Sequence, residues 1–228
     1  MATPWLKICG LTRAEDARLS LSLGARYLGC VLVPASPRCV TVPQAQALSA
    51  VAEGRLVVVV RDLPAAKLEE LLAAVHPAAV QLHGEEPPEL VHTLRTAHPE
   101  VEVWKVLAVA PAAEHVLLST PDPAAETERL LALARPYEAA GVAAFLVDTQ
   151  GPGGSGGTGQ TGDWAVAAEL ARRLERPLIL AGGLTPENLA DAAAQVQPAG
   201  LDVSSGVEAS PGCKSPARLQ ALFRALRA

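Results

Sequence analysis

The sequence lacks any hydrophobic run long enough to cross a membrane. Its most apolar stretches, such as LVVVV at 56–60, have the length of a strand, whereas a membrane-spanning helix needs about 20 apolar residues. A secretory signal is also missing, because charged residues follow Lys7 where an uninterrupted apolar segment would have to lie. These absences predict a soluble protein of the cytoplasm with no membrane partner.

Cysteine is scarce, and its positions (9, 30, 39 and 213) show no CxxC spacing. Neither a zinc cluster nor a disulfide scaffold is therefore indicated. The chain also lacks a basic excess, since its net charge is −5 and its isoelectric point is about 5.6. A nucleic-acid-binding groove needs a clustered basic face, so we expect no nucleic-acid partner.

Half of the residues are hydrophobic and 19% are charged, which predicts a substantial core and argues against global disorder. Short apolar runs recur along the chain and are separated by stretches with helical patterns. Because these runs are continuous rather than alternating, they are typical of strands buried on both faces, as in a parallel sheet. The expected strands are 5–9, 27–32, 56–60, 79–83, 103–109, 144–148, 178–182 and 200–204.

Helix-start signals lie in the stretches between these strands. TRAE at 12–15 and TVPQ at 41–44 have the spacing of a capping box. The Thr-Pro pair at 185–186 fits an N-cap and a first helical position. Two sets of apolar residues share a helical face, and they are 68, 71, 72 and 75 in one helix and 164, 167, 170, 171 and 174 in another.

Eight strand-then-helix units predict one α/β domain, residues 1–228, folded as a (β/α)₈ TIM barrel. The structural alternative is a doubly wound open sheet. The barrel is favoured because the units number eight, and because no G-x-G-x-x-G follows the first strand, where a dinucleotide-binding fold would carry it. The connection 110–143 has a first half rich in Pro and Ala, which we interpret as a flexible insertion around 110–124.

Polar residues stand at the carboxyl ends of the expected strands, where barrels of this kind build active sites. They are Cys9, the turn Ser36-Pro37-Arg38, Gln81, His83, Asp148, Gly182, Gly183, Ser204, Ser205 and Gly206. Taken singly, several have a plainer explanation, because a cysteine is often a small buried hydrophobe and a strand-end aspartate is often a helix cap. The glycines and serines of the last two loops indicate a phosphate site, which such barrels commonly build there from backbone N–H groups.

A glycine-rich stretch, GPGGSGGTGQTG at 151–162, closely follows Asp148. Part of it approaches the phosphate-binding pattern G-x-x-x-x-G-K-[ST], but Gln160 stands where the lysine is needed. A linker between domains is disfavoured because both flanks belong to the same expected barrel. We interpret the stretch as a mobile lid over the carboxylate of Asp148, with Asp163 as the N-cap of the next helix.

Taken together, these segments resemble the phosphoribosylanthranilate isomerase family of tryptophan biosynthesis. The matching motifs are KICGLT (7–12), SPR (36–38), AVQLHGEE (79–86), DT (148–149), GGTGQTGDW (156–164), LAGGLTPENL (180–189), DVSSGVE (202–208) and PGCK (211–214). Each motif is weak alone, but their order and their positions at strand ends make the set specific. The resemblance implies a single (β/α)₈ barrel that converts N-(5-phosphoribosyl)anthranilate to 1-(2-carboxyphenylamino)-1-deoxyribulose 5-phosphate. The reaction is an acid–base Amadori rearrangement that uses no metal and no organic cofactor.

By position, the resemblance implies that Cys9 is the general base, Asp148 the general acid and Arg38 the partner of the anthranilate carboxylate. A thiolate suits the first role if its pKa falls below about 8.5. A carboxylic acid suits the second if a closed, apolar site keeps it protonated. The protein would act as a monomer or a homodimer on this small phosphosugar–anthranilate substrate. The remaining substrate-binding residues would be Gln81, His83, Gly182, Gly183, Ser204, Ser205 and Gly206.

Two other functions fit parts of the pattern. The histidine-pathway phosphoribosyl isomerase performs the same rearrangement on a larger substrate, but it is expected to carry Asp where this chain has Cys9. A non-catalytic phosphosugar-binding barrel would leave the combination of Cys9, Arg38 and Asp148 unexplained. The departures from the family's pattern concern packing and loop anchoring rather than the acid and base, and they are Cys30, Leu32, Gly162 and Ser215.

Overall fold

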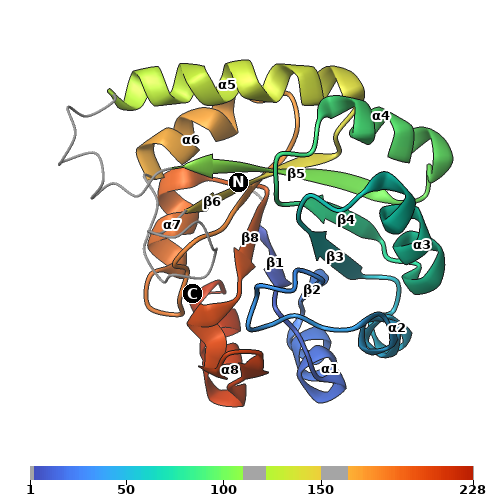
Figure 1. Ribbon diagram of the computed structural model, residues 1–228. Helices are drawn as coiled ribbons and strands as arrows, with labels where there is room; N and C mark the ends of the chain where they lie inside the picture. Colours follow the sequence, from blue (N-terminus) through green and yellow to red (C-terminus); the bar gives the residue numbers. More distant parts are fainter. Residues whose placement is uncertain (1–2, 110–121, 150–163, 228) are drawn as a thin grey trace.

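The computed structural model is a closed barrel of eight parallel strands with helices outside it (Figure 1). The structure describes residues 3–109, 122–149 and 164–227. The strands are β1 (Trp5–Ile8), β2 (Tyr27–Val31), β3 (Leu56–Val60), β4 (Ala79–Leu82), β5 (Glu102–Val109), β6 (Ala144–Thr149), β7 (Leu178–Leu180) and β8 (Gly200–Val203). The helices are α1 (Ala14–Leu23), α2 (Val42–Val51), α3 (Ala65–Val75), α4 (Pro88–Ala97), α5 (Pro123–Ala140), α6 (Trp164–Arg173), α7 (Leu189–Val196) and α8 (Pro216–Ala225). A 3₁₀ turn, η2 (Ser205–Val207), and a hairpin, β9 (Glu208–Ser210) with β10 (Cys213–Lys214), follow β8.

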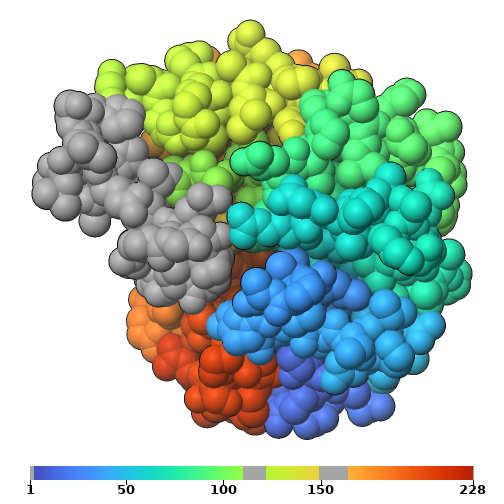
Figure 2. All heavy atoms as spheres, in the orientation of Figure 1, coloured from blue at the N-terminus to red at the C-terminus, as the bar shows by residue number. Residues whose placement is uncertain are grey.

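The first and last strands close the barrel. β1 pairs with β8 in parallel, from Trp5 opposite Gly200 to Ile8 opposite Val203. The elements follow one another around the molecule in chain order, so the blue N-terminal and red C-terminal parts meet in Figure 2, where α1 packs against α8. This closure confirms the predicted (β/α)₈ barrel and rules out the doubly wound open sheet.

Side chains alternate between the inside and the outside of the barrel, as the period of a strand requires. On β1, Leu6 and Ile8 belong to the main hydrophobic core, which packs beneath the helices. Lys7 points inward, because its ammonium contacts side chains of β4 and β8 across the barrel. Cys9 continues the inward series one position beyond β1 and lines the cavity at the carboxyl ends of the strands. The alternation therefore stacks Cys9 directly above Lys7.

Aromatic rings fill the other end of the barrel interior. Trp5, Tyr27 and Trp104 form a cluster whose ring centroids lie 4.9 to 6.0 Å apart. Gly200 makes room for this cluster, since a Cβ there would lie 2.5 Å from the Trp5 ring. The amino-terminal end is thus packed with side chains, and the polar residues gather at the carboxyl end.

The helix-start predictions have mixed outcomes. The capping box at 41–44 is confirmed, with Thr41 and Gln44 bonded to each other's backbone. The box at 12–15 is wrong, because the Thr12 hydroxyl donates to the carbonyl of Gly212 and α1 begins after Arg13. Thr185 is not the N-cap of α7 either, because it holds a turn and the helix begins only at Leu189.

Both predicted helical faces are confirmed. The face of α3 consists of Leu68, Leu71, Leu72 and Val75, which are its buried residues.

The predicted face at 164–174 also packs on the core. Ala167 and Leu170 are buried, and Trp164, Ala171 and Leu174 are partly buried and pack against the same core.

Two expected mobile segments fall mainly outside the described residues. The glycine-rich stretch 151–162 and Asp163 lie outside them, as do residues 110–121 of the expected insertion. The end of that insertion, 122–124, belongs instead to the start of α5, where the Asp122 side chain accepts a hydrogen bond from the N–H of Ala124. Among the helices of the described ranges, none is long and apolar enough to cross a membrane.

Candidate active site

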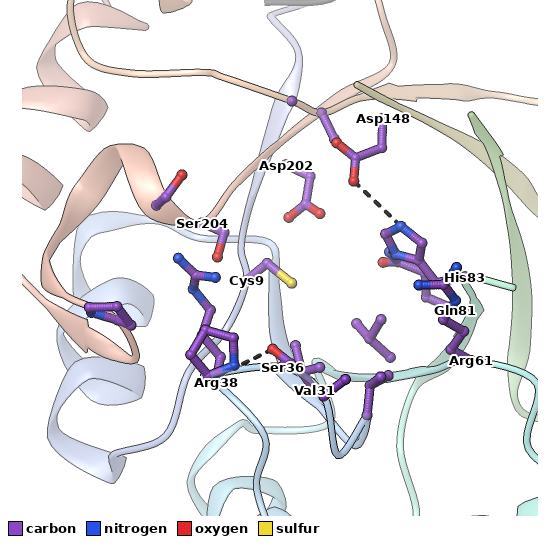
Figure 3. Close-up of a pocket in the computed structure, with 18 of the residues that line it drawn as sticks. Cys9, Val31, Ser36, Arg38, Arg61, Gln81, His83, Asp148, Asp202 and Ser204 are labelled. Atoms are coloured by element: carbon purple, nitrogen blue, oxygen red, sulfur yellow. Dashed lines mark hydrogen bonds and ion pairs between the residues drawn. The ribbon is translucent and has the colours of Figure 1, made fainter. Parts of the chain in front are cut away.

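A cavity of about 480 Å³ opens at the carboxyl ends of the barrel strands. It brings together residues from the ends of β1, β2, β3, β4, β6, β7 and β8. Figure 3 shows the Cys9 sulfur pointing into the open middle, with Arg38 and Ser204 on one side and His83 and Asp148 on the other. The predicted residues that line it are Cys9, Ser36, Pro37, Arg38, Gln81, His83, Asp148, Gly182, Gly183, Ser204 and Ser205.

Cys9 lies at the bottom of the cavity and is 8% exposed. Its backbone N–H donates to the carbonyl of Val203, which fixes the residue against β8. The next residue, Gly10, has φ +70 and lies so close to Arg38 that a Cβ would be 2.5 Å from the Arg38 Cδ. Burial raises the pKa of the Cys9 thiol and so does the charge of Asp202, while Lys7 acts in the opposite direction.

Asp148 lies next to the last residue of β6, on the opposite side of the cavity, where its Oδ2 lies 3.5 Å from the Nε2 of His83 (Figure 3). Burial, together with the charges of Lys7 and Arg61, lowers the pKa of His83 to about 4. The imidazole is therefore neutral at neutral pH, so its 3.5 Å contact with Asp148 is not an attraction between two full charges.

The neighbouring amide of Gln81 indicates which ring nitrogen of His83 carries the hydrogen. Gln81 Oε1 accepts from the Lys7 ammonium at 2.9 Å, so its NH₂ group faces the Nδ1 of His83 at 3.5 Å. An NH₂ group can only donate, which makes Nδ1 the acceptor and leaves the hydrogen on Nε2. His83 can then donate to Asp148 and orient its carboxylate.

Arg38 is already paired with a carboxylate of its own chain. Its Nε and Nη2 donate to the two oxygens of Glu208 at 2.9 and 2.7 Å. Glu208 also accepts from Lys214 at 2.9 Å and from the N–H of Gly212. Burial alone would raise the pKa of Glu208, but the hydrogen bonds from Arg38 and the charge of Lys214 hold it below its usual range. One edge of the Arg38 fork is therefore occupied, and within the described ranges its Nη1 side remains for a ligand.

Two glycines and an asparagine fix the shape of the loop after β7. Gly182 and Gly183 have φ values of +86 and +63, which glycine adopts without strain. Asn188 ties this loop together through the carbonyl of Gly183 and the N–H of Thr185.

Gly206 of η2 is not among the residues that line the cavity, so its predicted contact with substrate would have to come from its backbone N–H. A Cβ on Gly206 would collide with the carbonyl oxygen of Leu184. Its role in the structure is to let the loops after β7 and β8 approach each other.

Several buried charged residues of this region were missed by the sequence reasoning, namely Lys7, Asp202, Glu208 and Lys214. Lys7 and Asp202 form an ion pair at 2.9 Å beneath Cys9. The period of a strand could have shown that Lys7 shares the inward face of Cys9. No local signal reveals the pair of Lys7 and Asp202, because these two residues lie 195 positions apart in the chain.

The chain matches known proteins over nearly its whole length. The family model described as N-(5'phosphoribosyl)anthranilate (PRA) isomerase matches residues 6–225. A curated N-(5'-phosphoribosyl)anthranilate isomerase from Pseudomonas fluorescens is 38% identical over 223 residues, which are 97% of each chain. The tryptophan biosynthesis protein TrpCF of Yersinia pestis is also 38% identical, and the match covers 97% of this chain but only 41% of that longer protein.

Solved structures give the same result. Monomers derived from the dimeric phosphoribosylanthranilate isomerase of Thermotoga maritima match with a TM-score of 0.78 and 32% identity, covering 98% of both chains. A phosphoribosylanthranilate isomerase in complex with reduced 1-(o-carboxyphenylamino)-1-deoxyribulose 5-phosphate matches with a TM-score of 0.76 and 30% identity, again over 98% of both chains.

Proposed function

Because the chain belongs to the N-(5'-phosphoribosyl)anthranilate isomerase family, we propose that it carries out the family's reaction with Cys9 as general base and Asp148 as general acid. The reaction is the isomerisation of N-(5-phosphoribosyl)anthranilate to 1-(2-carboxyphenylamino)-1-deoxyribulose 5-phosphate in tryptophan biosynthesis. The observation that supports the residue assignment is the convergence of Cys9, Asp148 and Arg38 on one cavity.

The first step opens the ribose ring. The lone pair of the anthranilate nitrogen forms a double bond to sugar C1 as the bond between C1 and the ring oxygen breaks. Asp148 gives its proton to the departing ring oxygen, which leaves a protonated imine and a carboxylate. His83, held neutral, then donates to that carboxylate and stabilises it as it forms.

The second step removes a proton from sugar C2. The Cys9 thiolate takes this proton, the C–H electron pair forms a double bond between C2 and C1, and the imine electrons return to nitrogen. The enolamine then tautomerises to the ketose product. One turnover therefore leaves Cys9 protonated and Asp148 ionised, so a proton must pass back from the thiol to the carboxylate before the next one.

The substrate's two anionic ends have separate places in this proposal. The planar anthranilate carboxylate lies against the Nη1 side of Arg38, whose orientation is fixed by Glu208. The phosphate lies between the loops after β7 and β8, on the N–H groups of Gly183, Ser205 and Gly206. We propose the cytoplasm as the compartment and a monomer or homodimer as the active form, the Thermotoga relative being dimeric.

The test is the consumption of N-(5-phosphoribosyl)anthranilate, followed by the loss of its fluorescence after the purified protein is added. We expect turnover by the wild type and a large loss in Cys9→Ala. The substrate of the histidine-pathway isomerase is tested in parallel and should not turn over. Binding without turnover of either substrate would refute the proposal in favour of a phosphosugar-binding barrel.

A further inference from the structure

A buried lysine that the proposed reaction does not yet use lies beneath the cysteine. Lys7 is 0% exposed, and its ammonium donates to Gln81 Oε1 and Asp202 Oδ2, both at 2.9 Å. Burial alone would lower the pKa of Lys7, but the charge of Asp202 holds it above its usual value, so the ammonium keeps its proton. The Lys7 ammonium is thus a fixed positive charge inside the barrel, beneath the cavity.

The sulfur of Cys9 and the Cε of Lys7 both border the space left by the missing side chain of Gly29. Gly29 of β2 creates that space, because a Cβ there would lie 2.8 Å from the Cys9 sulfur and 3.0 Å from the Lys7 Cε. The ammonium is one bond beyond Cε, which places it beside the thiol. The period of β1 gives the same arrangement, since residues 7 and 9 both point inward.

Asp202 places an opposite charge in the same layer. Its Oδ2 accepts from Lys7, while its Oδ1 is buried and has no hydrogen-bond partner within the described parts of the chain. A carboxylate with only one oxygen bonded is incompletely neutralised, so its remaining charge repels a thiolate nearby. Lys7 and Asp202 therefore act on Cys9 with opposite signs.

We propose that Lys7 and Asp202 are positioning residues that set the charge state of Cys9, with Lys7 stabilising the thiolate and Asp202 opposing it. The inference rests on the proposed role of Cys9 as the general base. Lys7 supplies the positive charge that makes a buried thiolate attainable in this site. Asp202 holds the ammonium beneath the sulfur and limits how far the thiolate is favoured, so that the base can also release its proton after each turnover.

Other ionisable groups also face the thiol. The charge of Lys214 in β10 lowers the pKa of Cys9 and so favours the thiolate. The Arg38 charge also interacts with that of a Cys9 thiolate. Cys30 of β2 is buried, and burial raises its pKa to about 12, so it remains a thiol. The experiment below leaves these groups unchanged, so that a shift in the Cys9 titration reports the loss of Lys7 or Asp202.

The experiment measures the charge state of Cys9 without any need for turnover. In a background carrying Cys39→Ser and Cys213→Ser, the rate of iodoacetamide alkylation at Cys9 is followed by mass spectrometry as a function of pH. Only the thiolate reacts, so the midpoint of the profile reports its formation. The variants are Lys7→Met, which keeps the length of the side chain, Asp202→Asn, and the double variant, which leaves no buried charge unpaired.

We expect the midpoint to rise by about one pH unit or more in Lys7→Met and to fall in Asp202→Asn. The turnover number of Lys7→Met at neutral pH should fall at least about tenfold, with recovery at higher pH and little change in KM. A purely structural role would move the alkylation midpoint in the same direction in both variants, and that result, or an unchanged midpoint, would overturn the proposal.

If Lys7→Met does not fold, Asp202→Asn decides alone, since an unchanged or raised midpoint contradicts the inference. Failure of the proposed function would look different, because the wild type would then not turn over N-(5-phosphoribosyl)anthranilate, or Cys9→Ala would keep its activity, whatever the alkylation profiles show.

Discussion

Arg38 and Glu208, which are far apart in the chain, are joined by two hydrogen bonds at the mouth of the cavity. The Arg38 side chain is only 12% exposed, and the pair fixes the direction in which its remaining N–H groups point. Lys214 also bonds to Glu208, so two cations share this one carboxylate. The arginine is therefore pre-oriented by its own chain before any substrate carboxylate arrives, which reduces the ordering cost of binding.

Replacing Arg38 should mainly weaken substrate binding. A charge-assisted hydrogen bond is worth about 1.5–3 kcal/mol, so Arg38→Ala should raise KM by roughly 10- to 100-fold with a smaller effect on the turnover number. Arg38→Lys should recover only part of the loss, because an ammonium cannot reproduce the planar fork. Steady-state kinetics with N-(5-phosphoribosyl)anthranilate checks this, and an unchanged KM in both variants would show that the carboxylate binds elsewhere.

The cysteines provide a matched set for the proposed base. Cys9→Ala should keep the fold and reduce turnover by at least about 10²-fold, the usual scale for loss of a general base. Cys39→Ala and Cys213→Ala, outside the cavity, are the controls and should retain activity. Circular dichroism establishes the fold and steady-state kinetics the rate. Wild-type turnover in Cys9→Ala would return this residue to the role of a core side chain.

Asp148→Asn should separate proton donation from shape. The amide has the size of the carboxyl group but cannot give a proton to the ring oxygen, so turnover should collapse by at least about 10²-fold. Affinity for a product analogue should be largely retained, and isothermal titration measures it. A variant that lost affinity and turnover equally would indicate that Asp148 binds the substrate rather than acting as the acid.

The barrel and most of the cavity could be predicted from the sequence because both depend on local patterns. Runs such as LVVVV at 56–60 coincide with the observed strand, and a residue at the end of an inward-facing series must reach the cavity. The pairs Lys7–Asp202 and Arg38–Glu208 could not be predicted in this way. Their partners meet only after the barrel has closed, and opposite charges give no spacing signal in one sequence. The failed cap at Thr12 has the same cause, since its hydroxyl is taken by Gly212 near the other end of the chain.

The neutral His83 should make the stability of the protein depend on pH. Its folded pKa of about 4 lies below the unfolded value near 6.5, so the unfolded state binds the proton more readily. The contribution of His83 to the free energy of unfolding is fully present above pH 6.5 and is lost as the pH falls from 6.5 to 4. Its upper limit is about 3 kcal/mol.

Urea unfolding of the wild type and of His83→Gln, at pH 7 and at pH 5, isolates this effect from other groups. The free energy of unfolding should fall more steeply between these two pH values in the wild type than in the variant. Nitrogen-15 NMR at neutral pH should show the hydrogen on Nε2. Parallel pH dependences in the two proteins would contradict the neutral, buried state of this histidine.

Gly206→Ala should damage the proposed phosphate site while leaving the acid and base in place. The added Cβ would collide with the Leu184 carbonyl and lie 3.1 Å from the Thr185 Cα, which are backbone atoms that cannot rotate away. The loops after β7 and β8 must then separate, which misaligns the N–H groups of Gly183 and Ser205. The matched control is Gly54→Ala, because Gly54 has φ +71 and its added Cβ meets no atom of the described residues within 4 Å. This control should lose only about 1–2 kcal/mol of stability through backbone strain.

Inhibition of the enzyme by inorganic phosphate measures the phosphate site directly. Its inhibition constant should rise at least about tenfold in Gly206→Ala and stay unchanged in Gly54→Ala. If a folded Gly206→Ala protein bound phosphate normally, the anion would have to bind elsewhere, and the glycine-rich stretch after Asp148 would again be the alternative.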